Sequence, residues 1–257
     1  MPISLDTLEQ GGTPRPPRLL VYGVKGIGKT TFASHAPNPV FLNLEDGMTS
    51  IDAPYWRLRS YAEVEEAIGA LHQQAHAFQT VVLDSLDWFE PMVWAETCAR
   101  NKWKSIETPG YGKGYKAAIP LWQDILADLT ALRDYRKMTV ILLAHPQVKR
   151  FDSPETDPYD RYRLKLNENG GALVEQAVDA VLFANFRTST IASETTKGAV
   201  RAVSSGERFL FTTERPAYTA KNRYGLPDVL PLKWDALAQH IPWFKNPQPS
   251  EYAEQGT

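Results

Sequence analysis

The sequence predicts an α/β fold whose mostly parallel central sheet is flanked by helices. Three observations favour this fold class. The short apolar run Arg18–Tyr22 leads directly into the glycine-rich stretch Gly23–Thr31. Two later apolar runs, Val40–Leu44 and Thr80–Leu83, are each followed by a carboxylate. Segments with helical periodicity separate the runs, and strands that alternate with helices build parallel sheets.

Length and composition are those of an ordinary globular protein. The chain has 257 residues, of which 43% are hydrophobic and 23% charged. We expect one domain over 18–245, with a flexible lead over 1–17 and a flexible tail over 246–257. A net charge of −2 provides no global attraction to nucleic acid, so such binding needs local basic segments. The single Cys98 excludes an internal disulfide, and the lack of a signal peptide or membrane-spanning run predicts a cytoplasmic protein.

The stretch Gly23–Thr31 matches the G-x-x-x-x-G-K-[ST] pattern of a phosphate-binding loop. Its glycines let the backbone curl so that several N–H groups point at one phosphate. Lys29 would contact the β- and γ-phosphates, and the Thr30 hydroxyl would coordinate Mg²⁺. The pattern therefore predicts ATP and Mg²⁺ as cofactors, rather than a glycine-rich turn that binds nothing. The predicted nucleotide-binding residues are Gly23, Val24, Lys25, Gly26, Ile27, Gly28, Lys29, Thr30 and Thr31.

Two residues at the ends of later strands belong to the same predicted site. Asp84 ends the run Thr80–Leu83 as a Walker B aspartate does, and would hold Mg²⁺ through water. His145 follows the apolar run Met138–Ala144, which we expect to be a strand buried on both faces. His145 either senses the γ-phosphate or merely caps the strand, and we favour the sensor.

Caps and periodicity predict the helices between these strands. Ser60 and Glu63 form a capping box for a helix that runs to about residue 76. An aromatic-rich helix over 87–100 carries Pro91 in its first turn. The remaining predicted elements are helices over 29–36, 117–135 and 171–177, strands over 55–58, 179–186 and 208–213, and a polar hairpin or loop over 187–205.

Residues 101–116 combine four lysines, three glycines and three aromatic residues with one glutamate. Mobile backbone, positive charge and stacking rings are what sequence-tolerant binding of single-stranded nucleic acid uses. A solvated loop whose aromatic rings cover the core explains the composition equally well. The candidate DNA-binding residues of this segment are Lys102, Trp103, Lys104, Tyr111, Lys113 and Tyr115.

Residues 146–169 turn polar directly after His145, and we predict a loop at the same end of the sheet as the nucleotide. Long loops in compact domains are usually functional or disordered. We interpret this one as a second DNA-binding segment, although four acidic residues between 152 and 160 weaken the case. Its candidate DNA-binding residues are Lys149, Arg150, Arg161 and Arg163.

The order of these motifs, followed by Lys-Asn-Arg-Tyr-Gly at 221–225, resembles the core of RecA-like ATPases. The late motif is similar to the Lys-Asn-Arg-Phe-Gly signature of bacterial RadA and to the Lys/Arg pair of replicative helicases and circadian-clock ATPases. With 257 residues and no extra domain, the chain most resembles the Sak-type recombinases, the compact single-strand annealing proteins of bacteriophages. The resemblance covers about residues 18–245.

The resemblance implies roles for particular residues. Glu45, with Asp46 as the alternative, would orient and deprotonate the attacking water. Lys221 and Arg223 would reach the nucleotide of a neighbouring subunit and neutralise transition-state charge there; a solvated turn is the alternative. A cation that acts in trans implies a homo-oligomer, either a ring or a filament. His145 stands where RecA has glutamine.

Three functions follow from these expectations. The resemblance favours a DNA-dependent ATPase that binds single-stranded DNA and promotes annealing or strand exchange in phage recombination, in the host cytoplasm. A single-strand DNA-binding protein is a further candidate partner. The second hypothesis is an ATP-driven assembly or loading switch that binds a protein and not DNA. A small-molecule kinase is disfavoured, because the sequence has no arginine-rich lid.

Overall fold

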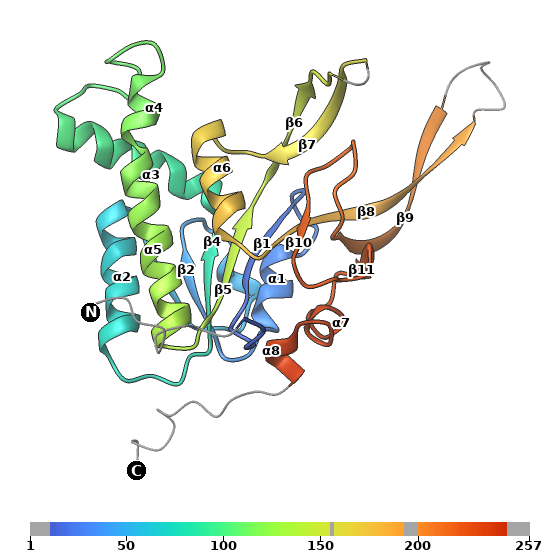
Figure 1. Cartoon of the computed structure of the whole chain (residues 1–257), viewed down its shortest axis with the longest axis horizontal. Coiled ribbons are helices and arrows are strands. Elements are labelled where there is room, and N and C mark those ends of the chain that lie inside the picture. The colour runs from blue at the N-terminus through green and yellow to red at the C-terminus, as the bar shows by residue number, and fades with distance from the viewer. Residues whose placement is uncertain (1–10, 155–156, 193–199, 246–257) are drawn as a thin grey trace.

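The computed structural model describes residues 11–154, 157–192 and 200–245, arranged around one large sheet (Figure 1). The strands of this sheet are β1 (Arg18–Gly23), β2 (Pro39–Asn43), β3 (Tyr55–Arg57), β4 (Thr80–Asp84), β5 (Thr139–Ala144), β8 (Ala180–Ala192), β9 (Val200–Phe211), β10 (Lys221–Asn222) and β11 (Val229–Pro231). The order is β11-β9-β8-β1-β5-β4-β2-β3, with β10 paired to β8. Strands from β8 to β3 pair in parallel, whereas β9, β10 and β11 pair antiparallel. The predicted fold class is confirmed.

Helices cover both faces of the sheet. They are α1 (Lys29–Ser34), α2 (Tyr61–Gln73), α3 (Leu86–Asn101), α4 (Lys113–Ala117), α5 (Ile119–Tyr135), α6 (Glu168–Ala177), α7 (Trp234–Ala238) and α8 (Pro242–Lys245), with a 3-10 turn over Met48–Ser50. Side chains along β1 point alternately to the two faces of the sheet and enter two hydrophobic cores. Leu20 and Tyr22 pack with residues of α2, α3, α5 and α6, while Leu19 and Val21 pack with residues of α1 and α7. Strands β4 and β5 are buried along their whole length because both faces are covered.

The parallel strands give the sheet two chemically distinct ends. Strands β1, β4 and β5 finish at Gly23, Asp84 and Ala144, which defines the carboxyl end of the sheet. The amino end lies where these strands begin. Figure 1 shows two segments rising at the carboxyl end: the stretch around α4 that follows α3, and a separate pair of strands that follows β5. The two predicted DNA-binding segments therefore lie at the end of the sheet that carries the phosphate loop.

The prediction of a loop over 146–169 is wrong. Strands β6 (Pro146–Phe151) and β7 (Tyr159–Leu164) pair as an antiparallel hairpin, and α6 begins at Glu168. Most of the hairpin is exposed or half-buried, so it lacks the apolar alternation that marks a half-buried strand. Cross-strand pairs hold it instead, among them Phe151 and Tyr159 with ring centroids 5.5 Å apart.

Smaller predictions fail at the ends of elements. Because α3 begins at Leu86, Pro91 lies beyond the first turn, and Trp88 of the same helix is 51% exposed. The capping box holds in part: the Ser60 hydroxyl accepts from the Glu63 N–H at 3.2 Å, but the Glu63 carboxylate accepts from Arg59. The predicted tail and residues 1–10 lie outside the described residues. Within the described part of the chain, no helix is long and apolar enough to cross a membrane.

Candidate nucleotide-binding site

The phosphate loop uses its glycines for two different reasons. A Cβ on Gly23 would lie 2.2 Å from the carbonyl oxygen of Ala184, so only glycine lets β1 and β8 approach this closely. Gly28 has φ +104°, in the left-handed region, directly before the first residue of α1. The sequence therefore folds here as a strand, a tight loop and a helix, with the loop at the carboxyl end of the sheet.

Three side chains of the predicted site lie close together at this loop. The Thr30 hydroxyl donates to Asp84 Oδ2 at 2.7 Å, which joins α1 to the end of β4. Lys29 is 7% exposed, and its Nζ donates to the Gly23 carbonyl oxygen at 2.9 Å. Burial lowers the pKa of Lys29. The neighbouring carboxylates raise it, Asp84 most strongly, but they do not cancel the effect of burial. A phosphate would replace the Gly23 carbonyl as the partner of this ammonium.

Asp84 and Thr30 fit a magnesium ion. Asp84 is 2% exposed, and burial raises its pKa to about 6 despite the hydrogen bond from Thr30. Its Oδ1 is buried and has no hydrogen-bond partner among the described residues. Mg²⁺ prefers oxygen ligands, and an unpartnered carboxylate oxygen beside a threonine hydroxyl provides them. These two residues would hold the ion that accompanies ATP.

Glu45 lies close enough to the site for its charge to act there, whereas Asp46 pairs with a residue outside it. The charge of Glu45 raises the pKa of both Lys29 and Asp84, which it can do only from nearby. Asp46 is exposed and pairs with Arg57 at 3.4 Å. Of the two acidic residues, Glu45 is therefore the one whose charge acts on the site.

His145 is held by a carboxylate that the sequence analysis did not single out. Its Nδ1 lies 3.0 Å from Asp87 Oδ2, and its backbone N–H donates to Asp87 Oδ1 at 3.0 Å. Burial alone would raise the pKa of Asp87, but the hydrogen bonds and charge of His145 hold it below its usual range. Strand β5 lies between β1 and β4, so His145 stands between the phosphate loop and Asp84.

Residues 15–224 match the model of the AAA domain family AAA_24. The chain belongs to this family. Membership makes it a P-loop NTPase of the AAA type, which supports ATP binding and hydrolysis at the loop described above. A comparison with curated proteins finds no match.

In this AAA domain, α3 anchors both legs of the β6–β7 hairpin. Asp87 binds His145, which precedes β6, and Glu90 binds Asn167, which follows β7. Both carboxylate oxygens of Glu90 accept from the Asn167 N–H at 3.0 Å, and Glu90 is only 5% exposed. An acidic residue in the first turn of a helix is a signal that could have found Asp87. Nothing local in the sequence marks Glu90.

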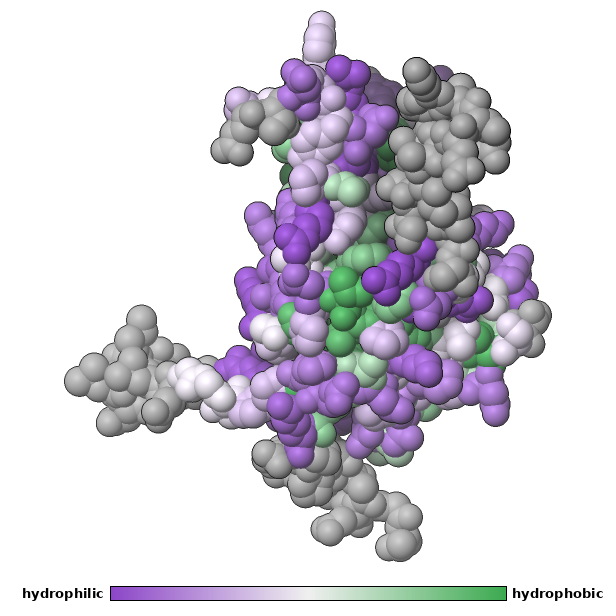
Figure 2. Space-filling model, turned by 90° about the vertical axis from the view of Figure 1, so that its right-hand side faces the viewer, coloured by the Kyte–Doolittle hydropathy of each residue, from purple (hydrophilic) through white to green (hydrophobic). Residues whose placement is uncertain are grey.

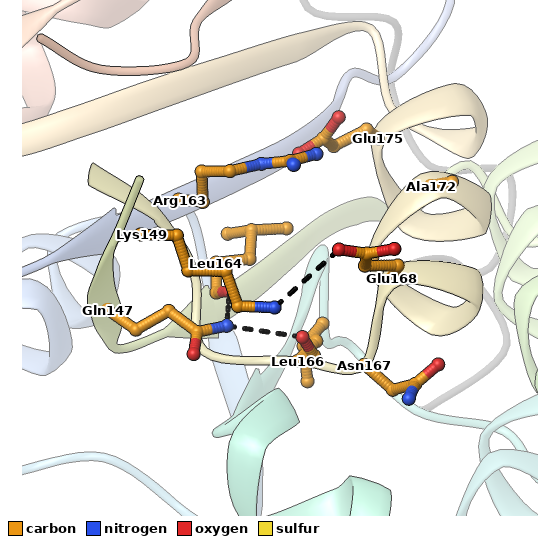
Figure 3. A pocket seen from close by; sticks show the side chains of 10 residues that line it. Gln147, Lys149, Arg163, Leu164, Leu166, Asn167, Glu168, Ala172 and Glu175 are labelled. Atoms are coloured by element: carbon orange, nitrogen blue, oxygen red, sulfur yellow. Dashed lines mark hydrogen bonds and ion pairs between the residues drawn. The ribbon is translucent and has the colours of Figure 1, made fainter. Parts of the chain in front are cut away.

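The base of the hairpin packs on α6, as Figure 3 shows. Lys149 lies 3.8 Å from Glu168, and Gln147 donates across the hairpin to the carbonyl oxygens of Leu164 and Leu166. The cavity between them measures about 20 Å³, room for about one water molecule. This region positions the hairpin and cannot hold a nucleotide.

The segment around α4 contains both the lysines and the aromatic residues that were expected to bind DNA. Lys102, Lys104 and Lys113 are exposed and make no ion pair among the described residues, and Tyr111 is 99% exposed. Tyr115 instead donates to the Glu107 carboxylate and packs edge-on against Trp94 of α3. Trp103 is half-buried. The lysines and Tyr111 are therefore available to a partner, whereas Tyr115 covers the core.

The hairpin cations are less available. Arg161 is 8% exposed, pairs with Glu214 at 3.0 Å and lies over the Phe151 ring. Arg150 is exposed and lies 3.7 Å from Asp152. Figure 3 shows Arg163 reaching toward Glu175, and its charge opposes the rise that burial causes in the pKa of that carboxyl. Arg161 thus has a structural role, which argues against its predicted DNA contact.

Lys221 and Arg223 lie at the amino end of the sheet. Lys221 Nζ donates to the carbonyl oxygens of Glu175, Gln176 and Val178, at the end of α6. Arg223 lies 3.5 Å from Asp179 and is 55% exposed. A cavity of about 270 Å³ opens there, lined in part by Arg15, Arg133 and Arg223. Asp179 precedes Ala184 by five residues, about 16 Å along a strand, so neither cation approaches the phosphate loop of its own chain.

Proposed function

We propose that this AAA domain is an ATPase that binds single-stranded DNA and promotes annealing or strand exchange in phage recombination. The phosphate loop and the Thr30–Asp84 pair support the nucleotide part of the proposal. One observation carries the DNA part: exposed lysines without ion pairs among the described residues share one segment with the fully exposed ring of Tyr111, at the end of the sheet that carries the phosphate loop.

Each residue of the nucleotide site has a distinct task in hydrolysis. The loop N–H groups and Lys29 bind the phosphates, and Glu45 takes a proton from the water that attacks the γ-phosphate, which leaves ADP and phosphate. Mg²⁺, when bound by Thr30 and Asp84, supplies positive charge beside the phosphates. His145, which Asp87 orients, would distinguish ATP from ADP.

The segment around α4 suits a DNA strand whatever its sequence. Its lysines neutralise backbone phosphates, and a base can stack on Tyr111. Lys149, Arg150 and Arg163 of the hairpin contribute less, because carboxylates already lie beside them. The nucleotide can influence the hairpin through His145, which directly precedes β6.

We also propose that the protein works as a homo-oligomer, a ring or filament, in which Arg223 contacts the nucleotide of a neighbouring subunit. Its distance from the phosphate loop of its own chain supports this arrangement. Figure 2 shows hydrophobic residues exposed near the middle of one face. Among the exposed apolar residues, Val229 of β11 is 46% exposed. Such surfaces mark interaction sites. A single-strand DNA-binding protein remains a candidate partner.

Binding of a labelled oligothymidine, followed by fluorescence anisotropy, tests the DNA part. Tyr111→Ala should weaken binding about tenfold, because stacking of one base contributes about 1–3 kcal/mol. Tyr135→Ala is the matched control, because Tyr135 is 73% exposed but lies at the end of α5. Replacing Lys102, Lys104 and Lys113 by alanine should reduce the slope of log affinity against log salt by about 2. If both tyrosine variants bind like the wild type, the proposed DNA-binding surface around Tyr111 is wrong.

The partner-binding switch is the second candidate. The hairpin favours it, because its cations pair with acids while Val148 is 57% exposed, a mixture that suits a protein surface better than DNA. If the wild type binds no oligonucleotide but ATP changes its sedimentation, the switch is the better account.

A further inference from the structure

We propose that Arg208 of β9 binds the nucleotide phosphates from within the same chain. A Cβ built on Gly28 would lie 3.1 Å from Arg208 Nη1. Gly28 is the glycine that directly precedes Lys29 in the phosphate loop. A guanidinium group therefore lies against the part of the loop that would surround a phosphate.

Strand geometry explains why Arg208 points this way. Leu210, two residues further along β9, packs in the core that contains Phe32 and Ala33 of α1, and residues two apart share a face of a sheet. Arg208 thus points to the α1 face, just beyond the end of the apolar layer. Phe186 is its cross-strand partner and packs against the same core.

Leu232 is hydrogen-bonded to the backbone of Arg208 and also lies near Gly28. The Leu232 N–H donates to the Arg208 carbonyl oxygen at 2.9 Å, and Leu232 Cδ2 would lie 3.9 Å from a Cβ on Gly28. Leu232 and Phe186 are thus the residues next to Arg208 on the two adjoining segments. Arginine also presents several fixed N–H donors that match phosphate oxygens.

The guanidinium is available for a ligand. Arg208 is exposed, and it forms no ion pair within the part of the chain that the structure describes. Arg161, Arg215 and Arg223, by contrast, each lie within 3.5 Å of a carboxylate oxygen. A polyphosphate on the loop would supply the anion that Arg208 lacks. The inference rests on the proposed nucleotide site and adds a cation to it that the sequence motifs do not include.

The test is the affinity of dilute protein for a fluorescent ADP analogue. Arg208→Ala should weaken binding about 10- to 100-fold, and Arg208→Lys should recover part of the loss because it keeps the charge. Arg187→Ala is the matched control: it removes an arginine from the neighbouring strand whose guanidinium lies over Phe209, on the other face. It should bind like the wild type. Equal affinities for Arg208→Ala and Arg187→Ala would overturn the inference.

A mixing experiment separates action within one chain from action between chains. If Arg208 acts in its own chain, Arg208→Ala and Lys29→Ala damage the same site. Every subunit of the mixture then lacks either Arg208 or Lys29 at its own nucleotide. Mixing should then restore no ATP hydrolysis, whereas restored activity would contradict the proposal. A wild type that binds no nucleotide would refute the proposed function itself. A wild type that binds nucleotide but ignores DNA would refute only its DNA part.

Discussion

The two ends of the central sheet carry positive side chains in opposite situations. At the carboxyl end, where Ala184 packs on Gly23, Arg208 of the paired strand reaches the phosphate loop and has no ion pair among the described residues. At the amino end, Lys221 donates to three carbonyl oxygens, and Arg223 lies beside Asp179. The comparison teaches that position and existing partners decide what a cation can do. Arg208 lies at the phosphate loop of its own chain, Arg223 lies far from that loop, and Lys221 is hydrogen-bonded to the end of α6.

The largest effect that tests this comparison is expected at the amino end. Arg223→Ala should lower the steady-state rate of ATP hydrolysis about 10³-fold or more, because a cation supplied in trans stabilises transition-state charge. ADP affinity of dilute protein should not change, since Arg223 is far from the loop of its own chain. A nearly unchanged rate would leave Arg223 as a partner of Asp179 alone.

At the carboxyl end, Lys29→Ala should lower the rate of ATP hydrolysis about 10²- to 10³-fold through the loss of one positioned donor. Lys25 lies in the same loop, but its side chain is exposed. Lys25→Ala should therefore keep the rate within about twofold, because the loop contributes backbone N–H groups at that position. Equal losses in the two variants would contradict the assignment of Lys29.

Lys221 should matter for stability more than for chemistry. Lys221→Met leaves the last carbonyl groups of α6 without their charged donor, so the free energy of unfolding should fall by about 1–3 kcal/mol. Lys233→Met removes an exposed lysine and should change it by less than about 0.5 kcal/mol. Urea unfolding measures both. If Lys221→Met is as stable as the control but inactive, the lysine acts on nucleotide after all.

The last prediction compares a buried carboxylate, Glu90, with a half-buried one, Asp179, at the other end of the sheet. Burial raises the pKa of Glu90 from 4.5 to about 7, whereas the hydrogen bonds and charge of Arg18 hold the pKa of Asp179 below its usual range. Between pH 4.5 and 7 only the folded state keeps the Glu90 proton, so its contribution to stability falls as the pH rises. Asp179 acts oppositely: its contribution is lost as the pH falls.

Glu90→Gln keeps an acceptor for Asn167 without the charge. The variant should therefore gain stability relative to the wild type as the pH rises from 5 to 7.5, on the order of 1 kcal/mol for each unit of the pKa shift. Thermal unfolding at the two pH values measures the difference. A gain of equal size at both pH values would contradict the raised pKa.

The sequence predicted the buried part of the site much better than the exposed part. Gly28, Lys29 and Asp84 were predictable because a phosphate loop and a strand that ends in aspartate are local patterns with one structural context. The hairpin over 146–164 was missed because its exposed strands have no apolar period. Arg208 was missed because only the order of β8 and β9 beside β1 brings it to the loop. The position of Lys221 at the end of α6 likewise depends on pairing distant in sequence.

The most direct test of the central claim is ATP hydrolysis by a mixture of Lys29→Ala and Arg223→Ala, with and without single-stranded DNA. The account predicts that each variant alone is inactive, that the mixture recovers part of the wild-type rate, and that DNA stimulates both the mixture and the wild type. A mixture as inactive as its components, together with a wild-type rate that does not respond to DNA, would contradict both the shared active site and the role of DNA.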